Sequence, residues 1–416
     1  MDKQKTVLIL ALLLIILSLR FIFYYQSNLQ LKDGQFVSFK TSIISEPKIV
    51  SNYQVVFANL ERNKILIKTD LFSIMHYGDT VRISGRIKLK TLENKRTITA
   101  MYFPKIEAVK NQKNVFLSLI NSIRQKIILL FSKTLPTPSS SLLLGIVFGI
   151  KESMPKDFSD NLRTSGVLHV VAASGMNISM IGSFLSSIFA FFFKRQIALA
   201  LSIFAIIFYA VLAGLEASIL RASIMGILVF SSQILGRQSL AVYGLFLAGF
   251  TMLFFSPNLI SDVGFQLSFF ATLGLLYLKP IFDINPKIKT ILKKSIIGEE
   301  ISTTISAQLA TLPILLANFG SYSIWSIAVN GLLLWTIPTV MAVGGIGAIV
   351  GIILEPFGKL ILYLSIPFLF YFQKTVEIFA GFKGAITFNQ IPWQFVVGYY
   401  ILLLGLISSF KRNIKI

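Results

Sequence analysis

The chain has 416 residues, of which 54% are hydrophobic and only 14% are charged. This composition, with a mean hydropathy of +0.74, indicates a polytopic α-helical membrane protein and excludes a water-soluble monomer. The absence of cysteine excludes disulfides, thiolate catalysis and cysteine zinc sites. A net charge of +21, from 39 Lys and Arg against 18 Asp and Glu, favours polyanionic partners, either anionic membrane lipid or nucleic acid. Positive-inside topology accounts for part of this excess.

The first apolar run extends from Val7 to about Tyr25 and follows Lys3 and Lys5. It is just long enough to cross a bilayer. No small-residue cleavage site follows it, as a secretory signal peptide would require. We therefore predict that residues 1–29 form an uncleaved signal anchor, which is the first transmembrane helix.

Residues 30–113 differ abruptly in composition, because charged residues and alternating β-branched and aromatic positions replace the apolar run. Strand-like alternation occurs at residues 36–39, 53–57, 64–68 and 80–89. The length of the segment and the pattern of residues 78–87 suit a small oligonucleotide-binding (OB-like) β-barrel. Residues 32–113 contain 15 Lys and Arg against 7 Asp and Glu, which favours a polyanion as the partner of this soluble domain.

Apolar residues recur at three- and four-residue spacing from residue 115 to residue 135, with polar residues elsewhere. That spacing predicts an amphipathic helix in the membrane interface or along the edge of a domain. Pro136 and Pro138 end the helix, residues 142–150 are too short to span a bilayer, and residues 151–163 form a charged loop. The sequence leaves open whether residues 115–150 cross the membrane, re-enter it or lie flat.

Residues 114–416 are predicted to form a transmembrane domain. The apolar runs after the charged loop are residues 168–193, 197–215, 218–235, 240–256, 263–279, 299–318, 324–354, 360–380 and 393–410. If each run crosses once, the loops that contain Lys or Arg fall on one side. The loops at 214–217, 257–262 and 319–323 contain none and fall on the other. The positive-inside rule then places both termini in the cytoplasm and the β domain outside the cytoplasmic (inner) membrane.

Several polar residues lie where lipid would not tolerate them. Arg221 interrupts the run at 218–235, so it either lines a hydrated path or pairs with Glu216 and reaches the interface. His169 either packs through a hydrogen bond or takes part in chemistry. No Asp, Glu or Cys lies within helical reach of it to complete a triad or a metal site. We therefore predict no catalytic residue, no metal site and no cofactor.

Glycine-rich stretches in the apolar runs are interpreted as packing surfaces. One predicted helical face consists of small residues, which are Gly175, Ser179, Gly182 and Ser186. Gly345, Gly347 and Gly351 imitate a dinucleotide motif, but they lie in an apolar stretch without a preceding strand, so helix packing explains them too. No Walker A phosphate loop is present, so any driving force for transport comes from elsewhere.

Five blocks of the sequence occur in an order that is typical of one family. They are residues 142–149 (LLLGIVFG), 168–175 (LHVVAASG), 220–222 (LRA) with 235–237 (LGR), 256–257 (SP) with 262–268 (DVGFQLS), and 307–313 (AQLATLP) with 318–320 (NFG). Together with the β domain they extend from about residue 30 to residue 350. In this order they resemble the ComEC family of competence membrane channels.

The resemblance implies that the protein carries one strand of incoming DNA across the cytoplasmic membrane during natural transformation. It implies an extracytoplasmic DNA receptor, a cytoplasmic helicase-like ATPase and a separate nuclease as partners, and a homo-oligomer is one arrangement that the sequence leaves open. A DNA strand needs a hydrated path with basic or polar walls. The residues expected to line this path are His169, Ser174, Asn177, Arg221, Arg237, Asp262, Gln266 and Gln308. Those expected to bind DNA on the OB-like domain are Arg82, Arg86 and Lys88. Those expected to serve helix packing are Gly175, Gly182, Gly264 and Pro313.

The sequence departs from the family pattern at two points. Asn177 stands where members usually have a second histidine, which weakens any role that needs protonation. Many members also carry a C-terminal metallo-β-lactamase-like nuclease domain. Here the sequence ends at Ile416 after an apolar run, and His76 and His169 are the two histidines. We therefore expect no such domain and no nuclease activity in this chain.

Two other interpretations come from different classes. A secondary transporter of a small anionic or peptide-like solute would bind its substrate between broken helices near the bilayer midplane. The sequence shows no internal repeat and no pair of matching broken helices to favour it. A membrane-embedded hydrolase is supported only by Ser174, five residues after His169, a spacing that is common by chance.

Overall fold

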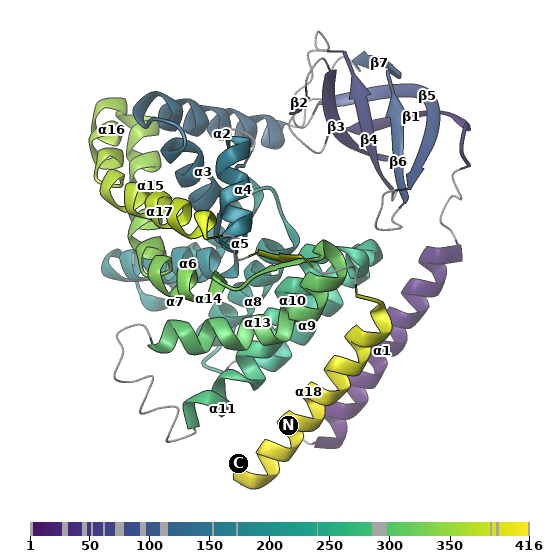
Figure 1. The fold of residues 1–416 in the computed structure, drawn as a ribbon, viewed down its shortest axis with the longest axis vertical. Helices are drawn as coiled ribbons and strands as arrows, with labels where there is room; N and C mark the ends of the chain where they lie inside the picture. The colour runs from purple at the N-terminus through teal and green to yellow at the C-terminus, as the bar shows by residue number, and fades with distance from the viewer. Residues whose placement is uncertain are drawn as a thin grey trace. The chain divides into compact units, whose positions relative to one another are not determined.

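The structure is a computed structural model in which the chain divides into two compact units, Ser18–Ile127 and Met1–Leu17 with Ile128–Ile416. The described residues are 3–26, 32–43, 48–50, 53–60, 63–70, 79–91, 97–108, 115–151, 154–171, 174–238, 240–284, 298–382, 385–387 and 391–414. Figure 1 labels the elements of both units.

The first unit contains one mixed β-sheet. Its strands are β1 (Phe36–Ser42), β2 (Lys48–Val50), β3 (Tyr53–Leu60), β4 (Asn63–Thr69), β5 (Thr80–Thr91), β6 (Thr97–Tyr102) and β7 (Lys105–Ala108). The strand order is β1-β5-β6-β4-β3-β2, and β7 also pairs with β5. Strands β4 and β6 run parallel, whereas the other described pairs of this sheet are antiparallel. The sequence predicted the regions of β1, β3, β4 and β5 but missed β2, β6 and β7.

Alternation along the strands builds the core of this unit. Ile65 and Ile67 of β4, Ile83 and Ile87 of β5 and Met101 of β6 are almost completely buried. Met101 is the register partner of both Ile67 and Ile87, so the three side chains share one face of the sheet. Each such burial stabilises the fold by about 1.5–3 kcal/mol.

One isolated bridge extends the sheet beyond its main path. Ile43, which follows β1, pairs with Ala58 of β3, and both residues are buried. In the strand order β1 lies beside β5 and is separated from β3 by other strands. At this bridge, however, the residue that follows β1 pairs with β3. The described pairings therefore give a curved mixed sheet, and the predicted closure into an OB-like barrel stays a prediction.

The second unit is helical. Helices α1 (Lys3–Gln26) and α2 (Val115–Thr134) each belong partly to this unit and partly to the first. The longer helices that lie wholly within the second unit are α3 (Ser139–Phe148), α4 (Lys156–Thr164), α6 (Gly175–Phe192), α7 (Arg195–Leu212), α8 (Ala217–Ile234), α9 (Ala241–Phe255), α10 (Val263–Tyr277), α13 (Gly298–Phe319), α14 (Ser326–Leu333), α15 (Thr336–Ile353), α16 (Glu355–Tyr363), α17 (Ile366–Gly381) and α18 (Trp393–Ile414). Shorter pieces are α5 (Leu168–Val171), η1 (Pro257–Ser261), α11 (Lys279–Ile284) and the paired strands β8 (Ser321–Ser323) and β9 (Ala385–Thr387).

Within the described residues, six helices are long and apolar enough to cross a membrane. They are Gly175–Phe192, Arg195–Leu212, Ala217–Ile234, Val263–Phe282, Ile301–Phe319 and Thr336–Ile353. Much of their surface carries large apolar side chains that face away from the protein, as lipid contact requires. The composition thus predicted the class correctly, because the chain is a multi-pass helical membrane protein.

Several predicted segments differ from the helices that form. The run at 324–354 divides into α14 and α15, and the run at 360–380 joins parts of α16 and α17. The predicted charged loop at 151–163 contains most of α4, whose Phe158 and Leu162 are buried one helical turn apart. Two apolar residues among charged ones did not form a periodic pattern long enough to predict this helix from the sequence.

Helix α3 lies inside the helical unit. All ten of its residues are buried, including Ser139, Ser140 and Ser141 of its first turn. It packs against α15 and α17, and Gln373 of α17 donates a 2.7 Å hydrogen bond from Nε2 to Ser139 Oγ. The helix ends at Gly149, which adopts φ 71° and returns its N–H to Gly145 O. This segment, predicted as too short to span, is therefore a short helix covered by protein.

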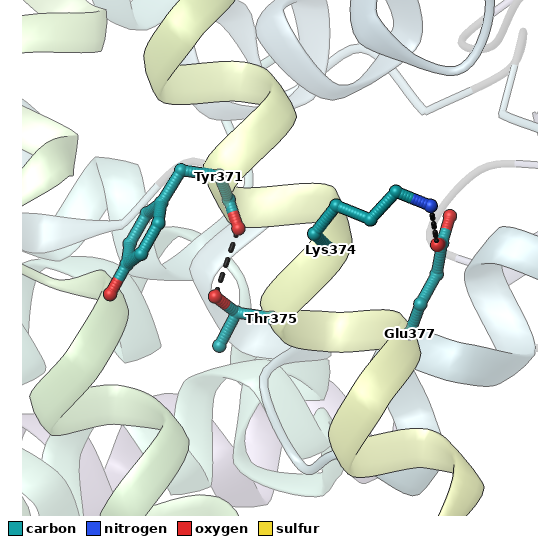
Figure 2. A network of polar contacts seen from close by, with 4 residues as sticks. All are labelled: Tyr371, Lys374, Thr375 and Glu377. Carbon is teal, nitrogen blue, oxygen red and sulfur yellow. Dashed lines mark hydrogen bonds and ion pairs between the residues drawn. The ribbon is translucent and has the colours of Figure 1, made fainter.

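Helix α17 carries a charged pair on its exposed surface. Lys374 Nζ lies 2.7 Å from Glu377 Oε2, three residues further along the helix (Figure 2). On another side of the same helix, Thr375 Oγ1 donates to the carbonyl oxygen of Tyr371 at 2.9 Å. The two opposite charges largely cancel, so this part of α17 offers little attraction to a polyanion.

Candidate functional site

A cluster of basic and aromatic side chains lies on the outer face of the β-sheet. Lys68 Nζ lies 4.3 Å from the ring centre of Tyr53 and 5.2 Å from that of Tyr102. Lys88 Nζ lies 5.8 Å from the centre of the same Tyr102 ring. These distances fall within the range of cation–π attraction. We call Tyr53, Lys68, Lys88 and Tyr102 the aromatic–basic face.

Strand register explains why these four residues meet. Lys68 of β4 is the parallel partner of Tyr102 in β6, and Lys88 of β5 is the partner of Ala100, two residues before Tyr102. Tyr53 of β3 lies two residues before Val55, the partner of Lys68. Residues two apart share a face, so three strand pairings bring the set together.

Phe103 follows Tyr102 in an unusual backbone conformation. Its φ is 47°, although it is an aromatic residue, and its side chain is 57% exposed. Its N–H donates to Lys68 O at 2.8 Å, which holds it at the end of β6. A bulky residue in the left-handed region costs about 1–3 kcal/mol. The exposed ring lies next in the chain to the aromatic–basic face.

The three basic residues predicted to bind DNA lie on one face of β5, and all are exposed. They have different neighbours. Arg82 is the register partner of Lys40 and of Glu107, whereas Arg86 is the partner of Phe36. The Lys105 ammonium, 2.9 Å from Glu107, donates a hydrogen bond that lowers the pKa of that carboxyl, and Arg82 adds to the effect. Glu107 therefore stays charged and offsets part of the charge of Arg82.

In the helical unit, Arg221 is buried on α8 with 8% of its surface exposed. Its Nη1 donates to Ser268 O and to Thr272 Oγ1, both on α10. The predicted alternative partner, Glu216, instead lies 3.9 Å from Lys151. The arginine is thus held by a helix backbone and a hydroxyl of α10, and it is not paired with Glu216.

Ser174 and Asn177 lie at the start of α6, close to the end of α3. Asn177 is buried, and its Nδ2 donates to Ile146 O at 2.7 Å while its Oδ1 accepts a 3.1 Å bond from Ser174 Oγ. Tyr209 of α7 donates from its hydroxyl to Val147 O at 2.7 Å. These bonds satisfy carbonyls in the last turn of α3, which have no helical partner of their own. The amide in place of the family's usual histidine therefore has a structural partner.

Asp262 and Gln266 act at the start of α10. Asp262 Oδ1 accepts the N–H of Phe265 at 2.8 Å and caps the helix. Gln266 Nε2 donates to Ile260 O at 2.8 Å, in the short helix η1 that precedes α10. Both predicted path residues thus make local bonds at one helix end.

Gln308 on α13 belongs to a small polar network. Its Oε1 accepts a 2.6 Å bond from the Tyr322 hydroxyl, and its Nε2 donates to Ser326 Oγ at 2.9 Å. Gly166, with φ +81°, lies so close that a Cβ there would be 2.6 Å from Ser326 Cβ. Only glycine permits this approach, which joins the turn after α4 to α14.

The other predicted residues lie apart from these groups. His169 is exposed on α5, and Arg237 is exposed beyond the end of α8. Sixteen residues separate Arg237 from Arg221, which is about 24 Å along a helix at 1.5 Å per residue. Ser174, Gly175, Asn177 and Arg221 are therefore the predicted residues that the fold brings together, around the first turn of α6.

The residues predicted for helix packing have different surroundings. A Cβ on Gly182 would lie 3.2 Å from Ile206 of α7 and 3.3 Å from Phe230 of α8. Gly264 has only Asp262 Oδ1 near such a Cβ, at 3.0 Å. Pro313 lies inside α13, where its missing N–H leaves one backbone carbonyl without its helical partner.

In the part of the chain that the structure describes, no group of three or more His, Cys, Asp or Glu side chains could hold a metal ion.

Sequence reasoning missed three members of the aromatic–basic face, namely Tyr53, Lys68 and Tyr102. Alternation within residues 53–57 and 64–68 predicted strands at both places but did not mark Tyr53 and Lys68 as members of a site. The pairing of Lys68 with Tyr102 joins positions 34 residues apart in sequence, and local patterns do not encode such a register.

Among the described residues, six long apolar helices and a mixed β-sheet define a multi-pass membrane protein with an N-terminal β domain. The sequence pattern of the family described as Competence protein matches residues 146–413, well over half of the chain. The chain belongs to this family, which confirms the resemblance inferred from its sequence blocks.

Two relatives show how far the similarity extends. ComE operon protein 3 of Bacillus subtilis (strain 168) is 27% identical over 214 residues, which are 51% of this chain and 26% of that protein. An uncharacterized protein of Aquifex aeolicus (strain VF5) is 22% identical over 371 residues, which are 88% of this chain and 81% of that protein. The similarity thus covers about a quarter of the Bacillus protein. No solved structure matches the chain.

Proposed function

We propose that this protein carries single-stranded DNA across the cytoplasmic membrane during natural transformation. Membership of the competence family supports this proposal. The observation that carries it is the aromatic–basic face, where Lys68 lies between Tyr53 and Tyr102 and Lys88 lies over Tyr102. Basic groups attract the phosphate backbone, and exposed rings offer stacking surfaces to unpaired bases. A duplex keeps its bases stacked inside, so it would gain only the charge attraction.

The proposed β domain is an OB-like barrel on the outer side of the membrane, with both termini in the cytoplasm. The curved mixed sheet and the Ile43–Ala58 bridge support a partly open barrel. The loops without Lys or Arg support the orientation. In this arrangement the β domain meets DNA before the helical unit does.

The proposed path through the helical unit uses polar side chains that now bond within the protein. Asn177, Gln266 and Gln308 each donate to a protein oxygen in this conformation. A passing strand would exchange some of these bonds for bonds to water and phosphate. The path therefore requires a second, opened conformation, in which the polar groups face a hydrated space.

The proposed partners follow from the same transport role. An extracytoplasmic receptor would deliver DNA, a separate nuclease would provide the single strand, and a cytoplasmic helicase-like ATPase would pull it inward. Neighbouring membrane lipid covers the apolar helices, and a homo-oligomer is a further arrangement to be tested. We propose that the chain itself acts as a channel, without enzymatic activity.

The test is deletion of the gene followed by complementation. Uptake of labelled DNA into the cytoplasm and transformation frequency are both measured, with DNA bound at the cell surface as the control. The proposal expects loss of uptake and transformation with surface binding unchanged, and recovery with the intact gene. Transformation that is unchanged after deletion would refute it.

A secondary transporter of a small anionic or peptide-like solute is the second candidate. The observation in its favour is α3, a ten-residue helix buried along its whole length, since transporters often bind solute at such interrupted helices. Accumulation of candidate solutes in proteoliposomes separates the two functions. Solute uptake that follows an ion gradient, combined with unchanged transformation in the deletion strain, would favour the transporter.

A further inference from the structure

Arg221 carries a buried positive charge that is not neutralised by any carboxylate of the described residues. Its side chain is 8% exposed. Among the described residues, no Asp or Glu oxygen lies within the 4.0 Å limit of an ion pair with it. A buried charge without a counter-charge is strongly unfavourable. Within the described part of the chain, an anion that would balance the charge of Arg221 is therefore missing.

Helix α10 fixes the position of the guanidinium but leaves part of it free. Nη1 donates to Ser268 O and Thr272 Oγ1, and the Thr272 hydroxyl itself donates to Ser268 O at 2.9 Å. In the described structure, Nε of Arg221 has no hydrogen-bond partner. The guanidinium has five N–H donors, so it keeps capacity for a further acceptor.

The free side of the guanidinium lies against the first residue of α6. A Cβ on Gly175 would lie only 2.6 Å from Arg221 Nη2, so the missing side chain of glycine admits the arginine. Ser174 precedes the helix but does not cap it, because its hydroxyl donates to Asn177 Oδ1. The first N–H groups of this 18-residue helix thus have no side-chain acceptor from their N-cap residue.

We infer that the first turn of α6 and the Arg221 guanidinium together bind a phosphodiester group of the transported strand. The inference rests on the proposed function. A helix N-terminus presents N–H donors and a partial positive charge, and arginine is a preferred partner of phosphate. Arg221 Nη2 lies beside Gly175, the first residue of α6, so one phosphate there would supply the negative charge that Arg221 lacks and the acceptor oxygens that the helix end lacks. Gly175 then keeps the guanidinium close to the helix end, a role beyond packing.

Photo-crosslinking in the full chain tests the site. Met176, on the first turn of α6 and 39% exposed, is replaced by benzoylphenylalanine in protein reconstituted into nanodiscs. A labelled single-stranded oligonucleotide is then irradiated with this protein at several salt concentrations. The expected result is a crosslink whose yield falls at least fivefold in Arg221→Met and stays within twofold in Arg221→Lys, which keeps the charge.

Two further variants separate binding from folding. Thr272→Val removes one anchor of the guanidinium but leaves the charge, so the crosslink should persist. Gly175→Ala should push the guanidinium of Arg221 away from the helix end and thereby lower the crosslink yield. This variant keeps the test informative if Arg221→Met fails to fold. An oligonucleotide with a neutral methylphosphonate backbone should crosslink equally weakly to all variants.

The outcomes distinguish this site from the proposed function. Equal crosslinking of wild type, Arg221→Met and Gly175→Ala would overturn the site. The site would also be overturned if no crosslink formed in a chain that still restores DNA uptake to a deletion strain. If the wild-type chain restores no uptake at all, the proposed function itself fails.

Discussion

Tyr399 donates a 2.8 Å hydrogen bond from its hydroxyl to the carbonyl oxygen of Leu309, four residues before Pro313. Proline has no N–H, so this carbonyl cannot make its usual helical bond. The neighbouring Tyr400 hydroxyl donates to Ala310 O at 2.7 Å. Helix α18 thus satisfies carbonyls at the point where Pro313 interrupts α13. In a membrane this matters, because water is not present to replace a missing bond.

Loss of the Tyr399 hydroxyl should destabilise the helical unit in a way that depends on Pro313. Tyr399→Phe should lower the free energy of unfolding by roughly 0.6–1.7 kcal/mol, from the average to the maximum measured for hydrogen bonds between membrane helices. In a Pro313→Ala background the restored N–H can bond to Leu309 O, so the same change should cost much less. Thermal unfolding of the four proteins in detergent measures the coupling. Strictly additive effects would contradict the assigned role of the tyrosine.

The aromatic–basic face should bind bases as well as phosphates. Tyr102→Ala should weaken binding of a single-stranded oligonucleotide by about 5- to 150-fold, because stacking contributes about 1–3 kcal/mol per base. Tyr102→Phe keeps the ring and should bind almost as wild type. Fluorescence anisotropy with the full chain gives the affinities. An abasic strand is the control, and an equal loss for abasic and normal strands would argue against stacking.

The basic residues of β5 should contribute unequally to salt dependence. Removing one phosphate contact lowers the slope of log Kd against log salt by about 0.7 for a single strand. We expect this change for Arg86→Ala and Lys88→Ala, and a smaller one for Arg82→Ala, because Glu107 already offsets Arg82. Glu107→Gln should enlarge the effect of Arg82→Ala. Slopes equal to that of the wild type in all of these variants would show that the basic residues of β5 do not contact DNA.

Two glycines of the α15–α16 hairpin offer a matched pair for stability. A Cβ on Gly358 would overlap the Cα of Gly351 and lie 2.6 Å from its nitrogen, whereas a Cβ on Gly345 meets nothing within 4 Å. Gly358→Ala should destabilise the protein by about 1–3 kcal/mol through overpacking. Gly345→Ala should be neutral or slightly stabilising, since alanine favours the helix. The melting temperatures of the two variants in detergent test this, and similar values would contradict the close approach of α15 and α16.

Local patterns in the sequence predicted much of the framework. Three- and four-residue spacing marked the helix at 115–135, where α2 forms, and period-two alternation marked β1, β3, β4 and β5. The break between α5 and α6 was not predicted, because His169 and Ser174 lie in one continuous apolar run. Local propensity has little to distinguish an interrupted helix from a continuous one when the residues at the break are small.

By itself, the sequence determined that the protein is a multi-pass helical membrane protein with a polar β domain, because composition and hydrophobic periodicity are local properties. The tertiary structure decided which polar groups meet. Lys68 reaches Tyr102 through a strand register, Arg221 reaches Gly175 through the packing of α8 on α6, and Tyr399 reaches Leu309 across 90 residues. Such contacts depend on how separate elements pack, and a single sequence does not record the partner that each buried polar group will find.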